Sequence, residues 1–166
     1  ATDYRTKIRA KLKNARSEAG RVQDLRAELE TAALLLRDER FTLEYEKYAA
    51  LKQRGPDFTV TFRTHTPFNV EVRRIRSTEL DGGSAEARTT KLTAVLCDKV
   101  GQMPPSIVNL LWLVAEDAIS EADLNEAGVT LRQLAERKTE EFFTRRGFAS
   151  AAAFLKQYQH LSGIVL

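Results

Sequence analysis

The sequence predicts an α/β fold in which a mixed sheet of about five strands has helices on both faces. Apolar and polar residues alternate from Asp57 to Arg63, and residues 68–75 follow as a second strand-like run. A continuous apolar run at 107–115, between turn signals, is typical of a buried strand. Apolar residues at helical spacing before, between and after these runs place helices around the sheet. The 166 residues suit one domain with a full core.

The first half of the chain is predicted to be a helical region followed by three strands. Residues from about 4 to 38 have the apolar spacing of a helix, with a break near Gly20. A short alternating strand follows at 41–45, and 47–54 is a connector. The Thr-His-Thr-Pro segment at 64–67 is typical of the tip of a hairpin between the next two strands.

The second half is predicted to be mainly helical around two further strands. Its polar, glycine-containing start reads as a loop, and serine N-caps mark two helix starts. The expected elements are a loop at 77–90, an amphipathic helix at 91–102, the buried strand at 107–115, a short helix after Ser120, a longer helix at 130–146 ending at Gly147, a helix from Ser150 to about Gln159, and a last strand at 161–166.

Composition bounds the class of protein. Hydrophobic residues make up 43% and charged residues 30% of the chain, as in ordinary soluble globules. No apolar run approaches the roughly 18 residues of a membrane span, and no charged-then-apolar leader is visible. The one cysteine, Cys97, cannot form an internal disulfide and falls in a helical apolar pattern, so we expect a buried side chain. A cytoplasmic setting fits these observations.

The charge distribution is uneven. The formal net charge is +3, which permits contact with nucleic acid without requiring it. Residues 1–26 hold eight basic and three acidic residues, an excess of five positive charges. Two interpretations stay open for this segment, namely a solvated helix face and an arm that contacts phosphates.

Two acidic residues lie on the adjacent predicted strands at 57–63 and 68–75. Asp57 follows Pro56 at the start of the first strand, and Glu71 lies between Val70 and Val72 in the second. A buried acid is costly unless it is paired or binds a metal ion. Two such acids, with the basic residue Arg73 after the second, are typical of a divalent-metal phosphodiesterase.

These residues and their order along the chain resemble the PD-(D/E)XK, or restriction-endonuclease-like, nuclease superfamily. The resemblance spans about residues 25–115, with 1–24 as a basic N-terminal helix and 116–166 as a helical extension with a last strand, all in one nuclease-like domain. It implies the restriction-endonuclease-like mixed sheet and hydrolysis of a phosphodiester in nucleic acid, with DNA favoured over RNA. A homodimer is a further expectation, because cleavage of both strands requires two sites.

The resemblance also implies a role for each matching residue. Asp57 and Glu71 would bind Mg²⁺ or Mn²⁺ together with the backbone carbonyl of Val72, since such hard cations take oxygen ligands. Glu28, at the edge of the core-facing side of the first helix, would hold a metal-bound water or a second metal ion.

The basic residue of the motif departs from the family, because Arg73 stands where the family has lysine. Arginine can offset charge on the phosphate but cannot accept a proton. The helix at 91–102 offers Lys91 and Lys99 as alternatives, and Lys99 shares a helical face with Gln102. The transition state would therefore be stabilised by Arg73 or by Lys99.

Other interpretations of the same residues stay open. Pro56 and Asp57 could form a plain turn, and Lys99 could be a surface charge. Glu71 could pair across the sheet with a nearby arginine, of which there are three: Arg63, Arg73 and Arg74. The domain could have lost catalysis and serve as a module that binds nucleic acid or a protein. An unrelated α/β domain with a chance motif is the third interpretation.

Overall fold

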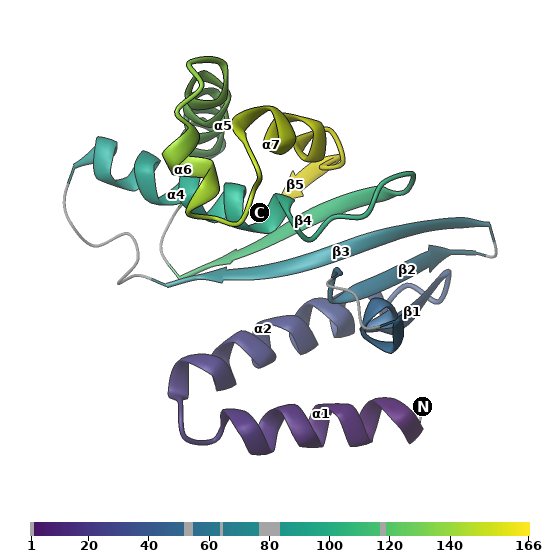
Figure 1. The fold of residues 1–166 in the computed structure, drawn as a ribbon. Coiled ribbons are helices and arrows are strands. Elements are labelled where there is room, and N and C mark those ends of the chain that lie inside the picture. The colour runs from purple at the N-terminus through teal and green to yellow at the C-terminus, as the bar shows by residue number, and fades with distance from the viewer. Residues whose placement is uncertain (1, 52–54, 64, 77–83, 117–118) are drawn as a thin grey trace.

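The computed structural model describes residues 2–51, 55–63, 65–76, 84–116 and 119–166. Its centre is a five-stranded sheet in the order β1-β2-β3-β4-β5 (Figure 1). The strands are β1 Phe41–Tyr45, β2 Phe58–Phe62, β3 Thr66–Ile75, β4 Val108–Ala115 and β5 Gly163–Val165. The pairs β1–β2 and β2–β3 are antiparallel, and the pairs β3–β4 and β4–β5 are parallel. The predicted mixed α/β sheet is confirmed.

Helices cover both faces of the sheet. On one face lie α1 and α2, and on the other lie α4, α5, α6 and α7 (Figure 1). Their bounds are α1 Thr2–Ala15, α2 Ala19–Leu35, α4 Ala85–Val100, α5 Glu121–Glu136, α6 Glu140–Thr144 and α7 Ala151–Tyr158, with a short 3-10 helix at Lys47–Leu51. None of the helices described has both the length and the apolar composition that a membrane crossing requires.

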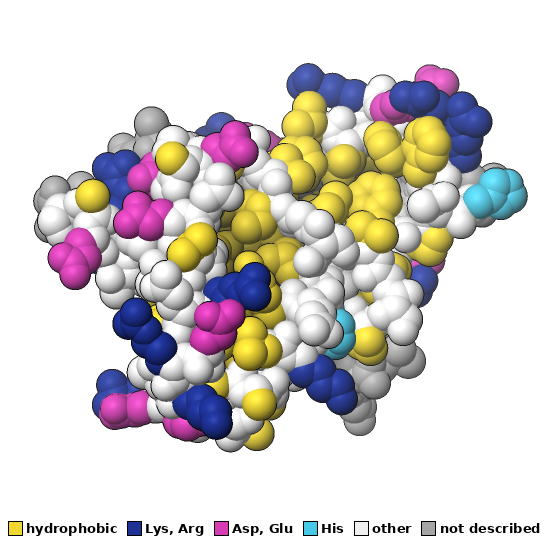
Figure 2. Space-filling view, turned by 90° about the horizontal axis from the view of Figure 1, so that it is seen from above, with side chains coloured by type: hydrophobic (Ala, Val, Ile, Leu, Met, Phe, Trp, Pro, Cys, Tyr) yellow, Lys and Arg dark blue, Asp and Glu magenta, His cyan; other side chains and the backbone are white. Residues whose placement is uncertain are grey.

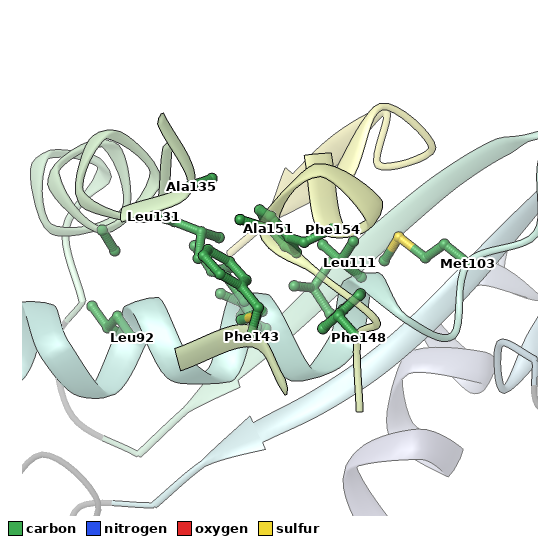
Figure 3. Close-up of a cluster of buried hydrophobic side chains, with 14 of the residues drawn as sticks. Leu92, Met103, Leu111, Leu131, Ala135, Phe143, Phe148, Ala151 and Phe154 are labelled. Carbon is green, nitrogen blue, oxygen red and sulfur yellow. The ribbon is translucent and has the colours of Figure 1, made fainter. Parts of the chain in front are cut away.

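The long strand β3 divides two hydrophobic clusters, because successive side chains of a strand point to opposite faces. Val70 and Val72 belong to the cluster under α1 and α2. Ile75 belongs to the larger cluster with α4 to α7, where Leu111 of β4 meets the aromatic side chains of the C-terminal helices (Figure 3). Glu71 shares the face of Ile75, so it points toward α4.

Several predicted boundaries of the first half are confirmed. The N-terminal helical region breaks after Ala15, just before Gly20, and β1 has the predicted bounds. The predicted loop at 77–90 is wrong over 84–90, since Ser84 caps α4 and accepts a hydrogen bond from the Ala87 amide at 3.1 Å. This first turn of α4 is largely exposed and has no apolar stripe, which is why its sequence resembles a loop. Residues 77–83, and 52–54 of the predicted connector, lie outside the described part.

The C-terminal half needs two corrections. A single helix, α5, runs from Glu121 to Glu136 behind the predicted Ser120 cap, and the predicted longer helix at 130–146 is interrupted. Lys138, with a φ of 55°, breaks it and starts a turn into α6. The apolar run of β4 is not fully buried either, because Val108 is 47% exposed where the short β5 no longer covers it.

The face that carries α4 to α7 shows a band of hydrophobic side chains with charged side chains along its margins (Figure 2). An open groove here is lined by residues of α4, α5, α7 and β5, including Leu124 and Tyr158. None of the predicted site residues lines this groove. The acidic side chains discussed next lie elsewhere, at the point where β2 and β3 separate.

Candidate functional site

Asp57 directly precedes β2, at the end of the sheet where β3 extends beyond its pairing with β2. The last paired residues of the two strands are Phe58 and Val70. Beyond them, Oδ2 of Asp57 accepts a hydrogen bond from the Val72 amide at 2.8 Å. The backbone carbonyl of Asp57 accepts one from the Glu46 amide, also at 2.8 Å. The carboxylate of Asp57 thus accepts a β3 amide beyond the last residue that pairs with β2. Hydrogen bonds fix both the backbone and the side chain of Asp57.

The local sequence explains why the chain bends at this point. A side chain at Gly55 would come within 2.5 Å of Cβ of Tyr48, so only glycine allows this close approach. Pro56 is buried and cannot donate to a sheet ladder. Gly55 and Pro56 together prevent β2 from pairing with β3 before Phe58, so Asp57 lies just before the first residue of β2.

Glu71 is the buried acid of the site. Its residue is 3% exposed, in the middle of β3. Oε1 accepts a hydrogen bond from Nζ of Lys99, which α4 brings over the sheet and whose side chain is 20% exposed. Oε2 of Glu71 is buried and has no hydrogen-bond partner among the residues that the structure describes. Lys99 therefore pairs with one oxygen of the Glu71 carboxylate, and the other oxygen is buried without a described partner.

Burial raises the pKa of both acids. Burial raises the pKa of Asp57 well above its ordinary value, and the neighbouring charges of Glu71 and Glu28 raise it further, against the hydrogen bond from Val72. Burial also raises the pKa of Glu71, although the ion pair with Lys99 opposes this shift. The ionised forms of both acids would be favoured by another cation between them.

Glu28 of α2 approaches the same place from the other helical layer, since its charge acts on both Asp57 and Glu71. Its Oε2 accepts a hydrogen bond from the Tyr45 hydroxyl at 2.9 Å and one from Nζ of Lys11 at 3.1 Å. The structure thus brings four of the predicted residues together, by a hydrogen bond or by the influence of their charges on one another: Glu28, Asp57, Glu71 and Lys99.

The arginines of β3 are placed differently. Arg73 is half-buried and shares the face of Glu71. Arg74 lies on the opposite face and binds Asp24 at 2.6 Å and Glu116 at 2.8 Å. Of the two cations that the sequence offered for the site, Arg73 and Lys99, it is Lys99 of α4 whose ammonium donates to Glu71.

The candidate metal ligands are the two carboxylates of Asp57 and Glu71. Among the described residues, no group of three or more His, Cys, Asp and Glu side chains could hold a metal ion. Asp57 and Glu71 are two carboxylates, and Mg²⁺ is commonly held by one or two carboxylates while it keeps several waters. Oε2 of Glu71, which has no described partner, is the observation that fits a bound cation, because a buried carboxylate oxygen requires a partner.

Sequence reasoning missed two sets of residues around the acids. One is the ammonium of Lys11 with its partners Tyr45 and Glu46, and the other is a buried pair of amides, Asn69 and Asn109. A signal existed for both. Lys11 follows Tyr4 and Ile8 at helical spacing, and each asparagine interrupts an apolar strand.

Comparison with protein-family models, with curated proteins and with solved structures gives no match for this chain.

Proposed function

We propose that this chain is a metal-dependent phosphodiester hydrolase, a nuclease with a restriction-endonuclease-like core, or a domain derived from one. The order of α2, β1, β2, β3, α4 and β4 is the order that the superfamily resemblance implies. The observation that carries the proposal is the meeting of Asp57, Glu71 and Lys99, from three different elements, at one buried place with an unpartnered carboxylate oxygen.

Each residue has a defined task in this proposal. Asp57 and Glu71 hold Mg²⁺ or Mn²⁺, which when bound supplies Lewis-acid stabilisation of the phosphoryl oxygens. Lys99, fixed by Oε1 of Glu71, orients the attacking water and offsets the negative charge that develops on the phosphate. Arg73, on the same face of β3, adds a second positive charge that contacts the phosphate but takes no proton.

The proposed substrate is nucleic acid, with DNA favoured over RNA. Arg5, Arg9 and Lys13 are four residues apart on α1, so they share one helical face, and all three are exposed. Among the side chains that the structure describes, none of them forms an ion pair with a carboxylate. Such a row suits a phosphate backbone. A homodimer would place two sites on the two strands of a duplex.

The test is Mn²⁺ binding by calorimetry together with nicking of plasmid DNA and of RNA. We expect the wild type to bind Mn²⁺ and to nick, and Asp57→Asn and Glu71→Gln each to lose at least about 100-fold in both. Glu44→Gln, an exposed acid on β1, is the matched control and should behave as the wild type. Mn²⁺ binding that survives in both site variants would contradict the proposed site.

A catalytically inactive module that binds nucleic acid is the second candidate, favoured by the exposed basic row of α1. In that case a labelled duplex would bind with the same affinity to the wild type and to Glu71→Gln, and no nicking would occur with Mn²⁺. Binding lost in the variant that carries Arg9→Gln and Lys13→Gln, with the fold intact, would place the contact on α1.

A further inference from the structure

Lys11 lies on the side of α1 that packs against the sheet, where the pattern of the helix places apolar residues. Tyr4, Ile8 and Ala15 occupy the same side at helical spacing. Tyr4 and Ile8 pack against the hydrophobic cluster beneath β1 to β3, and the Tyr4 and Tyr45 rings meet edge to face at 6.4 Å. The docked helix therefore delivers one ammonium into an otherwise apolar contact.

The ammonium of Lys11 has a complete set of partners. Nζ lies 3.1 Å from Oε2 of Glu28 and 2.7 Å from Oε1 of Glu46, and it stands 4.9 Å from the centroid of the Tyr45 ring. Burial alone would lower the pKa of Lys11, but the hydrogen bond to Glu46 and the charge of Glu28 raise it above its ordinary value. Lys11 is therefore a permanent cation in this place.

This cation is linked to the proposed site through Glu46 and Glu28. Glu46 donates its amide to the backbone carbonyl of Asp57, and Glu28 acts on Asp57 and Glu71 through its charge. Oε2 of Glu28 accepts hydrogen bonds from both Lys11 and Tyr45, so the ammonium of Lys11 already offsets the charge of this carboxylate.

We propose that Lys11 is a built-in counter-ion for Glu28, so that the site takes one divalent cation, on Asp57 and Glu71, and not two. The inference rests on the proposed function and adds the number of metal ions to it. Glu28 is then a positioning residue that fixes α1 through Lys11. A purely structural ion pair would fasten α1 in the same way, but its removal would leave the number of bound ions unchanged.

The decisive measurement is the stoichiometry of Mn²⁺ binding to the full chain by calorimetry. We expect one ion per chain for the wild type and for Lys11→Arg, and two ions for Lys11→Met, in which Glu28 is released. Lys13→Met is the matched control, because Lys13 is exposed on the opposite side of α1, and should bind one ion. Circular dichroism checks that each variant is folded.

A second variant keeps the inference testable where Lys11→Met does not fold. In Glu28→Gln we expect one bound ion with an affinity reduced no more than about tenfold, since only a nearby charge is lost. Two ions in the wild type, one ion with unchanged affinity in a folded Lys11→Met, or loss of Mn²⁺ binding in Glu28→Gln would overturn the inference and leave the proposed nuclease site standing. Absence of Mn²⁺ binding in the wild type would overturn both.

Discussion

Asn69 and Glu71 are two buried polar residues on the same face of β3, and their surroundings differ sharply. Oδ1 of Asn69 accepts the Thr59 hydroxyl at 2.8 Å, and Nδ2 donates to Oδ1 of Asn109 at 2.9 Å and to the Tyr48 hydroxyl at 3.1 Å. Oε1 of Glu71 accepts from one ammonium, and Oε2 has no hydrogen-bond partner within the described part of the chain. Both residues are at most 3% exposed.

The difference separates a structural polar cluster from a site. A satisfied buried network makes one arrangement of the strands unique, and each of its members is needed. An unsatisfied buried carboxylate costs stability unless a partner completes it. We therefore expect the polar cluster around Asn69 to stabilise the fold and the acids around Glu71 to cost stability. The predictions below test this contrast by changing the neighbours of these two residues.

The largest effect is expected for Asn109→Ala. Nδ2 of Asn109 lies within 3.0 Å of the backbone oxygens of Pro104, Ile107 and His160, and Oδ1 accepts from Asn69. Loss of these hydrogen bonds leaves several buried groups without partners, so the free energy of unfolding should fall by about 3 kcal/mol. Urea denaturation measures it.

The control for this prediction is Asn125→Ala, an exposed asparagine of α5. Its free energy of unfolding should stay within about 0.5 kcal/mol of the wild type, as for most surface substitutions. If Asn109→Ala were equally mild, water would have to replace the lost partners, and the contrast with Glu71 would disappear.

A smaller effect is expected for Lys99→Met. The change leaves the buried Glu71 without its counter-charge, which should lower the free energy of unfolding by about 2 kcal/mol, less than for a fully buried pair because Lys99 is partly exposed. Adding Glu71→Gln should recover most of the loss, because the remaining group is neutral. Lys156→Met, an exposed lysine of α7, serves as the control.

A double-mutant cycle in urea gives the coupling between the two residues. Equal free energies of unfolding for Lys99→Met with and without Glu71→Gln would mean that Glu71 is already uncharged in the folded protein. The ion pair would then be no part of the site, and Lys99 would be the surface charge of the alternative interpretation.

The sequence predicted most of the fold because local pattern and tertiary environment agree along β1, β2 and β3. Alternation, a proline-bounded hairpin and a serine cap at Ser120 each act within a few residues. Two of the errors have local causes. The start of α4 is exposed and has no apolar stripe, so its pattern resembles a loop. The helix predicted at 130–146 is broken at Lys138, whose φ is 55°.

The site shows where local pattern is not sufficient. Asp57 and Glu71 could be chosen from sequence because each is an acid beside buried strand residues. The contacts of Lys99 and Lys11 depend on how α4 and α1 cross the sheet, which no local pattern specifies. A lysine on the packed side of a helix was the available signal for Lys11, and it indicates burial but not the partner.

The smallest effect has the opposite sign and concerns Asp57→Asn. Because burial raises the pKa of Asp57, the folded protein retains a proton that the unfolded chain, with its ordinary value of 3.8, has already released. The contribution of this group to stability is therefore present below about pH 4 and is lost as pH rises through the folded pKa. Asparagine does not titrate, and its side-chain oxygen can still accept the Val72 amide.

In the presence of a chelator, Asp57→Asn should thus raise the free energy of unfolding at pH 7.5 by about 1 kcal/mol, with a smaller gain at pH 4.5. Asp38 supplies the opposite case, since its hydrogen bonds with Arg40 lower its pKa to about 2, and Asp38→Asn should lose stability at neutral pH. Saturating Mn²⁺ should stabilise the wild type and not Asp57→Asn, which reverses their order. A variant less stable than the wild type at pH 7.5 without metal would mean that the fold favours the ionised Asp57, and the contrast between a satisfied Asn69 and an unsatisfied acidic pair would not hold.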